Sequence, residues 1–180
     1  MHVERRWTSR DGLGLFARDY PGASGQARLP VICLHGLTRN SKDFEDVAPA
    51  IAQTGRRVVV PDVRGRGLSG RDPDPRNYQP RTYARDVLEM MHSLDISRAV
   101  FVGTSMGGII IMTLAVMRSK AVAAAILNDV GPAIAPAGVA RIMSYVGIGE
   151  EIRSWDDADD YMCRTMGVAF PGFAGRDWRR

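Results

Sequence analysis

Apolar runs of strand length alternate with stretches of helical spacing along the first 130 residues of this chain. Continuous apolar runs bounded by Gly, Pro, Asp or Asn are typical of buried strands. Such runs occur at residues 31–34, 58–60, 99–102 and 122–127. Short buried strands separated by helices predict an α/β protein, with a mostly parallel sheet and helices on both faces.

Two amphipathic stretches between these runs predict helices. The first extends from Phe44 to Ile51, and Ser41 is placed to cap its start. The second extends from Tyr83 to Leu94 and puts its apolar residues on one face. Both helices would lie against the sheet, because each has only one apolar face to bury.

The amino-terminal region has the pattern of a β-hairpin. Residues 3–9 and 13–20 are predicted to be two short strands, joined by a turn at Asp11-Gly12. Further along, residues 71–80 contain three prolines, and we expect a surface loop there.

The pattern changes after residue 132, where prolines and glycines interrupt the chain. Helical pieces are predicted around residues 139–146 and 155–166, and no strand pattern follows. We therefore expect a core domain over residues 1–132 and a separate helical region over residues 133–180.

Composition and charge change this picture little. The 180 residues carry a net charge of +4, and 22 of the 24 basic residues are arginine. They are scattered and form no basic run with interleaved aromatic residues, so we expect no nucleic-acid partner. No secretory or membrane-spanning segment is visible, and two distant cysteines form no C-x-x-C motif, so we expect a cytoplasmic protein with no membrane contact.

The segment Gly103–Gly108 is the strongest chemical signal in the chain. It follows one apolar run and opens another, so a buried strand ends there, the chain turns at Ser105, and a buried helix begins. A G-x-S-x-G sequence in that context is a nucleophile elbow. The turn exposes the serine hydroxyl, and the helix start supplies free N–H groups that suit a developing oxyanion.

Together with three other segments, this elbow resembles the α/β-hydrolase family. The four landmarks each follow a predicted strand and occur in the family's order: His35-Gly36-Leu37, Asp62 to Ser69, the Ser105 elbow, and Asn128 to Pro132. The resemblance covers the whole chain. Its core would be cut off after the sixth strand, with residues 133–180 forming the start of a helical cap.

The resemblance implies that Ser105 is the nucleophile of a serine hydrolase acting on an ester, lactone or related acyl bond. The main-chain N–H groups of Met106 and Leu37 would form the oxyanion hole. His35 and Gly36 would line the site and shape the oxyanion loop, with His35 not acting as the base. The partner would be a small-molecule acyl substrate, with no cofactor and no metal.

Two charged residues have open roles. Arg64 would line the site, and it could brace its turn through an ion pair with Asp62 or contact an acidic substrate. Asp129 ends the sixth predicted strand, where it is either the acid of a catalytic triad or a residue that lines the site. The aspartates at 156, 157, 159 and 160 follow Ser154, and we expect them to be first-turn acids behind a helix cap.

All three histidines, including His92 on the predicted surface helix, precede Ser105, whereas the family's catalytic histidine follows the last strand. We therefore expect the chain to be the amino-terminal part of a longer hydrolase. Its sixth strand would then be an apolar edge prone to self-association. The alternatives are a catalytically incomplete binding module or inactive fragment, and a carbon–carbon bond hydrolase or acyltransferase with the same core.

Overall fold

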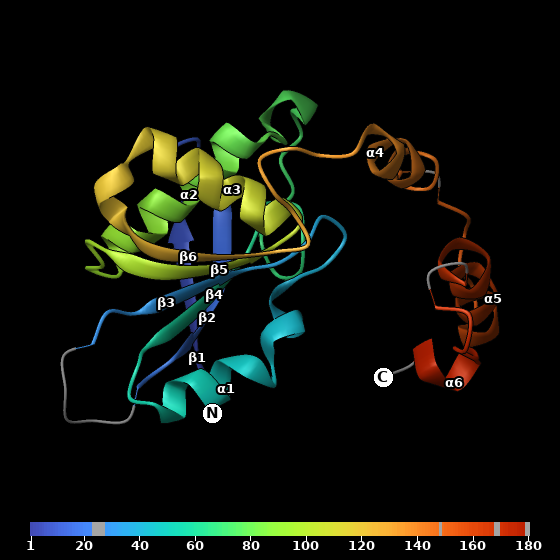
Figure 1. Ribbon diagram of the computed structural model, residues 1–180, viewed down its shortest axis with the longest axis horizontal. Coiled ribbons are helices and arrows are strands. Elements are labelled where there is room, and N and C mark those ends of the chain that lie inside the picture. Colours follow the sequence, from blue (N-terminus) through green and yellow to red (C-terminus); the bar gives the residue numbers. More distant parts are fainter. Residues whose placement is uncertain (23–27, 148, 168–169, 179–180) are drawn as a thin grey trace. The chain divides into compact units, whose positions relative to one another are not determined.

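The computed structural model describes residues 1–22, 28–147, 149–167 and 170–178, and the chain divides into two units (Figure 1). The first unit, Met1–Ala133, contains the sheet and three α-helices. In the second unit, Ile134–Arg180, the described residues contain helices and no strand.

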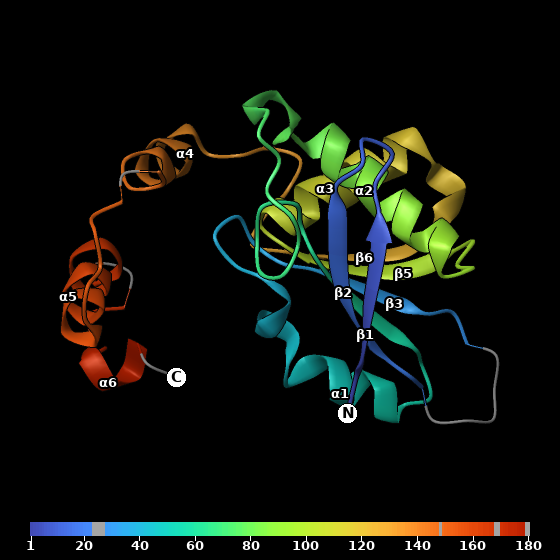
Figure 2. The same ribbon diagram turned by 180° about the vertical axis from the view of Figure 1, so that it is seen from behind.

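A six-stranded sheet forms the centre of the first unit, in the order β1-β2-β4-β3-β5-β6. The hairpin β1–β2 pairs antiparallel with β4, whereas β4, β3, β5 and β6 are mutually parallel (Figure 2). This mixed, mostly parallel sheet confirms the predicted fold class. The strands are β1 (Val3–Thr8), β2 (Gly14–Tyr20), β3 (Val31–Leu34), β4 (Val58–Asp62), β5 (Ala99–Thr104) and β6 (Val122–Asn128).

Helices cover both faces of this sheet, as predicted. Helices α2 (Pro80–Ser93) and α3 (Met106–Met117) lie on one face, and α1 (Val47–Gln53) lies on the other (Figure 1). Alternate residues of the central strands supply the two cores, so Ile32 packs towards α2 and α3 while Val31 packs towards α1. The carboxyl ends of the four parallel strands therefore lie at the same end of the sheet, and the loops that follow these strands lie close together there.

The start of the first helical segment differs from the prediction. Asn40, not Ser41, is the cap, and its side chain accepts the Lys42 N–H at 3.0 Å. The Ser41 hydroxyl instead accepts a hydrogen bond from Arg18 Nε. The predicted single helix is also divided into a 3-10 turn, Ser41–Phe44, and α1, because Pro49 has no N–H and is tolerated only in the first turn of a helix.

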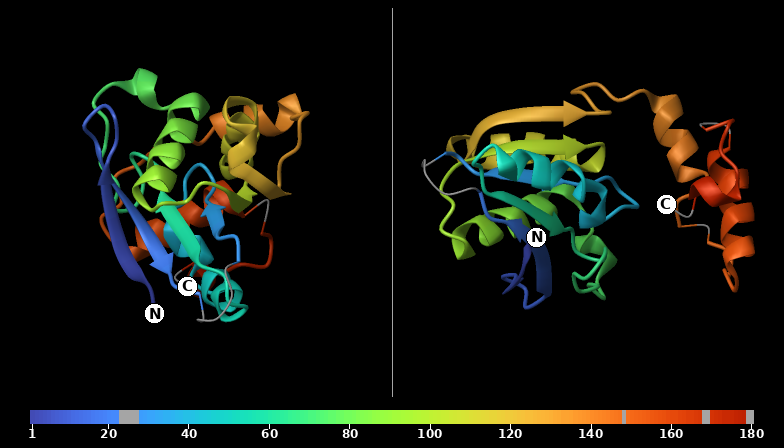
Figure 3. Two further views of the ribbon diagram at one scale, coloured as in Figure 1. Left: turned by 90° about the vertical axis from the view of Figure 1, so that its left-hand side faces the viewer. Right: turned by 90° about the horizontal axis from the view of Figure 1, so that it is seen from below.

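The sixth strand lies at one edge of the sheet, where the view from below shows it as the gold strand (Figure 3). Its Ile126 and Leu127 side chains are 59% and 38% exposed. An unpaired apolar edge is a template for pairing with another chain. Self-association through β6 stays a prediction.

The second unit contains α4 (Pro136–Met143), α5 (Trp155–Met166) and α6 (Gly175–Trp178). A capping box starts α5, because the Ser154 hydroxyl accepts the Asp157 N–H and the Asp157 carboxylate accepts the Ser154 N–H. The rings of Phe170, Phe173 and Trp178 contact one another within this unit.

The close approach of α3 to the sheet requires two glycines. A Cβ added to Gly103 would lie 2.6 Å from the main-chain carbon of Gly107. A Cβ added to Gly107 would overlap the carbonyl oxygen of Leu34 and lie 2.7 Å from its carbon. The end of β5, the turn and the start of α3 are therefore packed backbone against backbone on the end of β3.

We predict that Gly107→Ala lowers the free energy of unfolding by about 3 kcal/mol, because the added methyl group meets rigid backbone. Gly14→Ala is the matched control, since a Cβ there meets nothing within 4 Å and the glycine has no positive φ. Urea unfolding of both variants checks this. Equal stabilities would contradict the close packing of α3 on β3.

Candidate active site

Ser105 lies at the sharp turn between β5 and α3, with φ 51° and ψ −111°. Such a conformation costs a non-glycine residue about 1–3 kcal/mol and persists only where the surroundings enforce it. Here the Ser105 N–H donates to Asn128 O at 2.9 Å, and the Ser105 carbonyl accepts the Gly108 N–H at 2.9 Å. The side chain makes no capping hydrogen bond to the helix that it precedes.

Two main-chain amides near this turn have no acceptor. The N–H groups of Leu37 and Met106 donate no hydrogen bond within the described part of the chain. Leu37 follows the end of β3, and Met106 is the first residue of α3. The pairing of Leu34 with Gly103 brings these two segments together, and a Cβ added to Gly36 would lie 3.9 Å from the Thr104 carbonyl oxygen. Two free donors at one strand edge can receive a negatively charged oxygen.

His35 is fully buried, and both of its ring nitrogens are hydrogen-bonded to the main chain. Nε2 accepts the Val63 N–H at 3.0 Å, which leaves Nδ1 to donate to Gly36 O at 2.8 Å. This arrangement holds a neutral imidazole, and burial lowers the pKa of His35 below its usual range. His35 therefore ties the loop after β3 to the loop after β4, and neither nitrogen is free to take a proton from Ser105.

The turn after β4 is organised around the Asp62 carboxylate. It accepts the main-chain N–H of Ser41 at 2.6 Å and that of Leu68 at 2.7 Å. Gly67 has φ 52°, and a side chain there would overlap the carboxylate. The predicted ion pair between Asp62 and Arg64 is wrong, because both Asp62 oxygens are occupied by these amides and Arg64 extends elsewhere.

The Arg64 side chain is 1% exposed and binds three carboxylates. It forms a bidentate pair with Asp86, at 2.7 Å for each bond, and further ion pairs with Asp72 and Asp11 at 2.6 and 2.8 Å. The hydrogen bonds that Arg64 donates to the Asp86 carboxylate raise the pKa of Arg64 further, so it stays charged. A guanidinium with three counter-charges cannot reach an acidic substrate, so Arg64 braces the loops instead of lining an accessible site.

Asp129 directly follows β6 and has φ 58° with an exposed side chain. The pairing of Thr104 with Asn128 places it level with Ser105 on the neighbouring strand. The Asn128 amide donates to Thr104 Oγ1 at 3.3 Å across the same pair of strands. The position allows Asp129 to line a site at Ser105, and its role as triad acid or lining residue stays a prediction.

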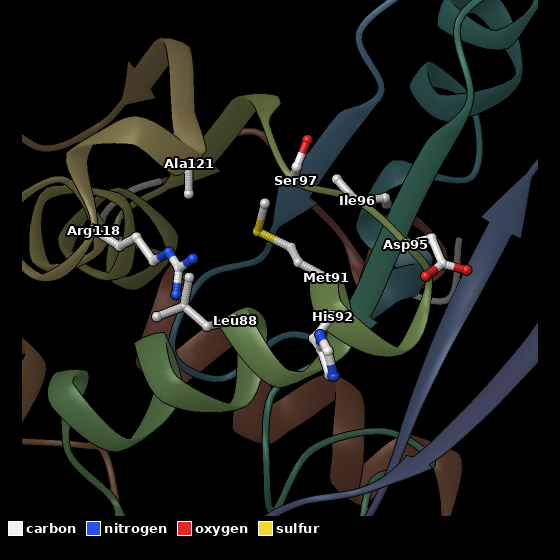
Figure 4. A pocket seen from close by; sticks show the side chains of 8 residues that line it. All are labelled: Leu88, Met91, His92, Asp95, Ile96, Ser97, Arg118 and Ala121. Carbon is white, nitrogen blue, oxygen red and sulfur yellow. The ribbon is translucent and has the colours of Figure 1, made fainter.

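The other two histidines lie at the opposite end of the sheet, near the amino ends of the parallel strands. His92 is in the last turn of α2 and borders a cavity of about 420 Å³ between the carboxyl ends of α2 and α3 (Figure 4). Arg118 and Met91 also line this cavity. It lies beside residues 95–97, which lead into the amino end of β5. His2 contacts the Tyr20 ring at the far end of the hairpin. Ser105 lies at the carboxyl end of β5, so neither imidazole is placed as its base.

Arg66 is a residue that the sequence analysis did not select. Its side chain contacts the Leu37 carbonyl and the Met106 sulfur, which belong to the two segments with free amides. The sequence offers no signal for this, because Arg64 and Arg66 lie two residues apart in one turn and only the folded turn shows where each side chain extends.

Neither a metal cluster nor a membrane span is found in the described ranges. No group of three or more His, Cys, Asp or Glu side chains there could hold a metal ion. Of the four aspartates expected in the first turn of α5, Asp156 and Asp157 lie there, whereas Asp159 and Asp160 lie further along the helix. No helix of the described residues has the length and apolar character to cross a membrane.

The chain belongs to the α/β-hydrolase family, since residues 30–158 match the family model described as alpha/beta hydrolase fold. It is similar to a solved α/β hydrolase from Novosphingobium aromaticivorans, with 42% identity and a TM-score of 0.88. That likeness covers 98% of this chain and 61% of the other.

Two curated relatives have named activities. A 3-hydroxybutyrate-oligomer hydrolase of Cupriavidus necator is 37% identical over 149 residues, which are 83% of this chain and 50% of the relative. The sn-1-specific diacylglycerol lipase ABHD11 of Xenopus laevis is 36% identical over 105 residues, which are 58% of this chain and 33% of the relative. The chain thus spans half or less of the length of these relatives.

We predict that His35 makes the protein less stable below pH 6.5. The folded state holds His35 neutral with a lowered pKa, whereas in the unfolded chain its pKa is about 6.5. Between the folded and unfolded pKa values of His35, the unfolded state binds more protons than the folded state. The contribution of His35 to the free energy of unfolding is therefore complete above pH 6.5 and falls by up to about 1.4 kcal/mol per pH unit on acidification. Urea unfolding from pH 7.5 to 5 measures it.

His35→Gln should flatten this part of the pH profile, and His92→Gln, which alters an exposed imidazole, should retain it. A profile in His35→Gln as steep as that of the unsubstituted protein would refute the assignment.

We also predict that Arg64→Met lowers the free energy of unfolding by about 3–5 kcal/mol, because it leaves the largely buried Asp72 and Asp86 without a counter-charge. Arg76→Met is the control: it removes an exposed ion pair with Asp74 and should change stability little. Similar losses in the two variants would show that the buried cluster does not brace the loops.

Proposed function

We propose that this chain carries the nucleophile and the oxyanion hole of a serine hydrolase that cleaves a carboxylic ester or a related acyl bond. The observation that carries the proposal is Ser105 in its strained turn, beside the free amides of Leu37 and Met106. An ordinary capping serine would bond to the first turn of its helix, and Ser105 does not.

The chemistry follows from this arrangement. Ser105 Oγ attacks the acyl carbon of the substrate, and its proton passes to a general base. The carbonyl oxygen becomes an oxyanion that accepts hydrogen bonds from Leu37 N–H and Met106 N–H. Collapse of this intermediate expels the alcohol, which takes up the proton, and leaves an acyl-serine. Water then attacks the acyl-serine, releases the carboxylic acid and restores Ser105.

The base in this scheme lies outside residues 1–180 of the enzyme. His35 has both nitrogens occupied, and His2 and His92 lie at the other edge of the sheet. The 3-hydroxybutyrate-oligomer hydrolase and the Novosphingobium hydrolase both extend well beyond the region that this chain matches. Asp129, level with Ser105, would line the site or orient such a base.

For the substrate class we favour aliphatic carboxylic esters. The names of two relatives specify 3-hydroxybutyrate oligomers and diacylglycerols, and both kinds of molecule are held together by carboxylic esters. Carbon–carbon bond hydrolysis and acyl transfer use the same nucleophile and oxyanion hole, but no described contact favours them.

We predict that a fluorophosphonate labels the 180-residue chain once, at Ser105, and that added imidazole accelerates this labelling. A general base is worth about 10²–10⁴-fold in rate, and imidazole in solution can supply part of that effect. Intact mass spectrometry follows the labelling. Ser105→Ala should abolish it, and Ser97→Ala, which alters an exposed serine, should not.

The outcomes separate the parts of the proposal. Fast labelling at Ser105 without imidazole would support the nucleophile and contradict a base outside these residues. No labelling of Ser105 even with imidazole would refute the hydrolase proposal and favour a binding module.

A further inference from the structure

The Arg66 guanidinium lies between two tyrosine rings at the carboxyl edge of the sheet. Its carbon is 5.7 Å from the centre of the Tyr78 ring and 5.4 Å from that of Tyr83. Tyr83 is buried in α2, and Tyr78 is fixed because its hydroxyl bonds to the main chain of Asp72. Two aromatic faces around a planar cation favour one orientation of the side chain.

In that orientation Arg66 connects the loop after β3, the turn after β4 and the start of α3. Nε donates to the Leu37 carbonyl at 3.1 Å, in the loop after β3. One terminal nitrogen donates to the Arg64 carbonyl at 2.9 Å, in its own turn after β4, and contacts the Tyr83 hydroxyl at 3.2 Å. The other terminal nitrogen lies 3.9 Å from Met106 Sδ, at the start of α3.

Arg66 differs from Arg64 in its counter-charges. Arg64 has three carboxylates, whereas Arg66 forms no ion pair within the residues that the structure describes. The acceptors of Arg66 are all neutral, so no carboxylate of the described residues contacts this half-buried positive charge. That charge lies beside the two segments whose free amides face no acceptor.

We propose that Arg66 is a positioning residue that holds the two oxyanion donors, Leu37 N–H and Met106 N–H, in their relative orientation. The proposal rests on the proposed hydrolase function. The Leu37 carbonyl and N–H flank the same Cα, so fixing the carbonyl restricts the rotation that would turn the N–H away. The positive charge beside these two segments also favours an oxyanion over a neutral carbonyl.

The test compares Arg66→Met, which removes the charge and the hydrogen bonds, with Arg66→Lys, which keeps the charge but cannot bond to both loops. Arg39→Met is the control, because Arg39 lies in the loop after β3, its side chain is exposed, and its one ion pair within the described ranges is with Asp43. Fluorophosphonate labelling in the presence of imidazole gives the limiting rate and the apparent affinity separately. A neutral fluorophosphonate places its phosphoryl oxygen where the oxyanion would form.

We expect Arg66→Met to lower the limiting labelling rate by about 10²-fold, the size of effect seen on loss of one oxyanion donor, with little change in apparent affinity. Arg66→Lys should fall between Arg66→Met and the unsubstituted chain, and Arg39→Met should match the unsubstituted chain. A fold defect alone would instead lower the fraction that labels and leave the limiting rate of the remainder unchanged.

Amide hydrogen exchange tests the positioning independently of any activity. The Arg39 N–H donates to Gly36 O and reports the order of the loop that contains Leu37. In Arg66→Met its exchange should accelerate at least about 10-fold, while amides of β3 keep their protection. Unchanged exchange at Arg39 would overturn the proposal, even if the labelling rate fell. If the unsubstituted chain does not label at all, the hydrolase proposal fails, and exchange at Arg39 alone decides whether Arg66 holds the loop.

Discussion

The site depends on one steric constraint, which is the contact of α3 with the ends of β3 and β5. Gly103 and Gly107 allow main chain to meet main chain there, and the Leu34 carbonyl lies where a side chain at Gly107 would be. This packing leaves so little space that Ser105 must turn within a single residue at φ 51°. The strain at Ser105 is therefore maintained by the sheet and the helix together, and it lifts the hydroxyl clear of the helix start.

A second level of structure keeps the loops at this edge in place, and it consists almost entirely of buried polar groups. His35 joins the loops after β3 and β4. The Asp62 carboxylate joins the same two regions, because it accepts the main-chain N–H of Ser41 and that of Leu68. Arg64 anchors the turn after β4 to the amino-terminal hairpin and to α2. Because each of these groups is satisfied by partners in the fold, none is available to a substrate, although all three lie in segments that resemble catalytic motifs.

The sequence was sufficient for the sheet, for its helices on both faces and for the elbow, because these features depend on apolar periodicity and on glycine spacing. It did not distinguish Asn40 from Ser41 as the cap, since both side chains can accept an amide and only the Arg18 contact separates them. It also could not show that Arg64 extends to Asp86 while Arg66 extends to Leu37. The positive-φ conformations of Gly65 and Gly67 set the directions of the Arg64 and Arg66 side chains in this turn. Contacts with residues far away in the sequence select those conformations.

The arrangement separates two requirements of acyl transfer that are often treated as one. Under the proposed function, stabilising an oxyanion needs donors held rigidly, and we assign this role to β3, β5, α3 and the loops between them. Moving the serine proton needs a titratable group, and His35, the buried imidazole at this end of the sheet, is already committed to structure. His35 illustrates the division, since burial lowers its pKa and the two hydrogen bonds that make it a good brace occupy both of its nitrogens. A base that must alternate between protonation states in each turnover therefore has to come from an element that the loops do not use for support.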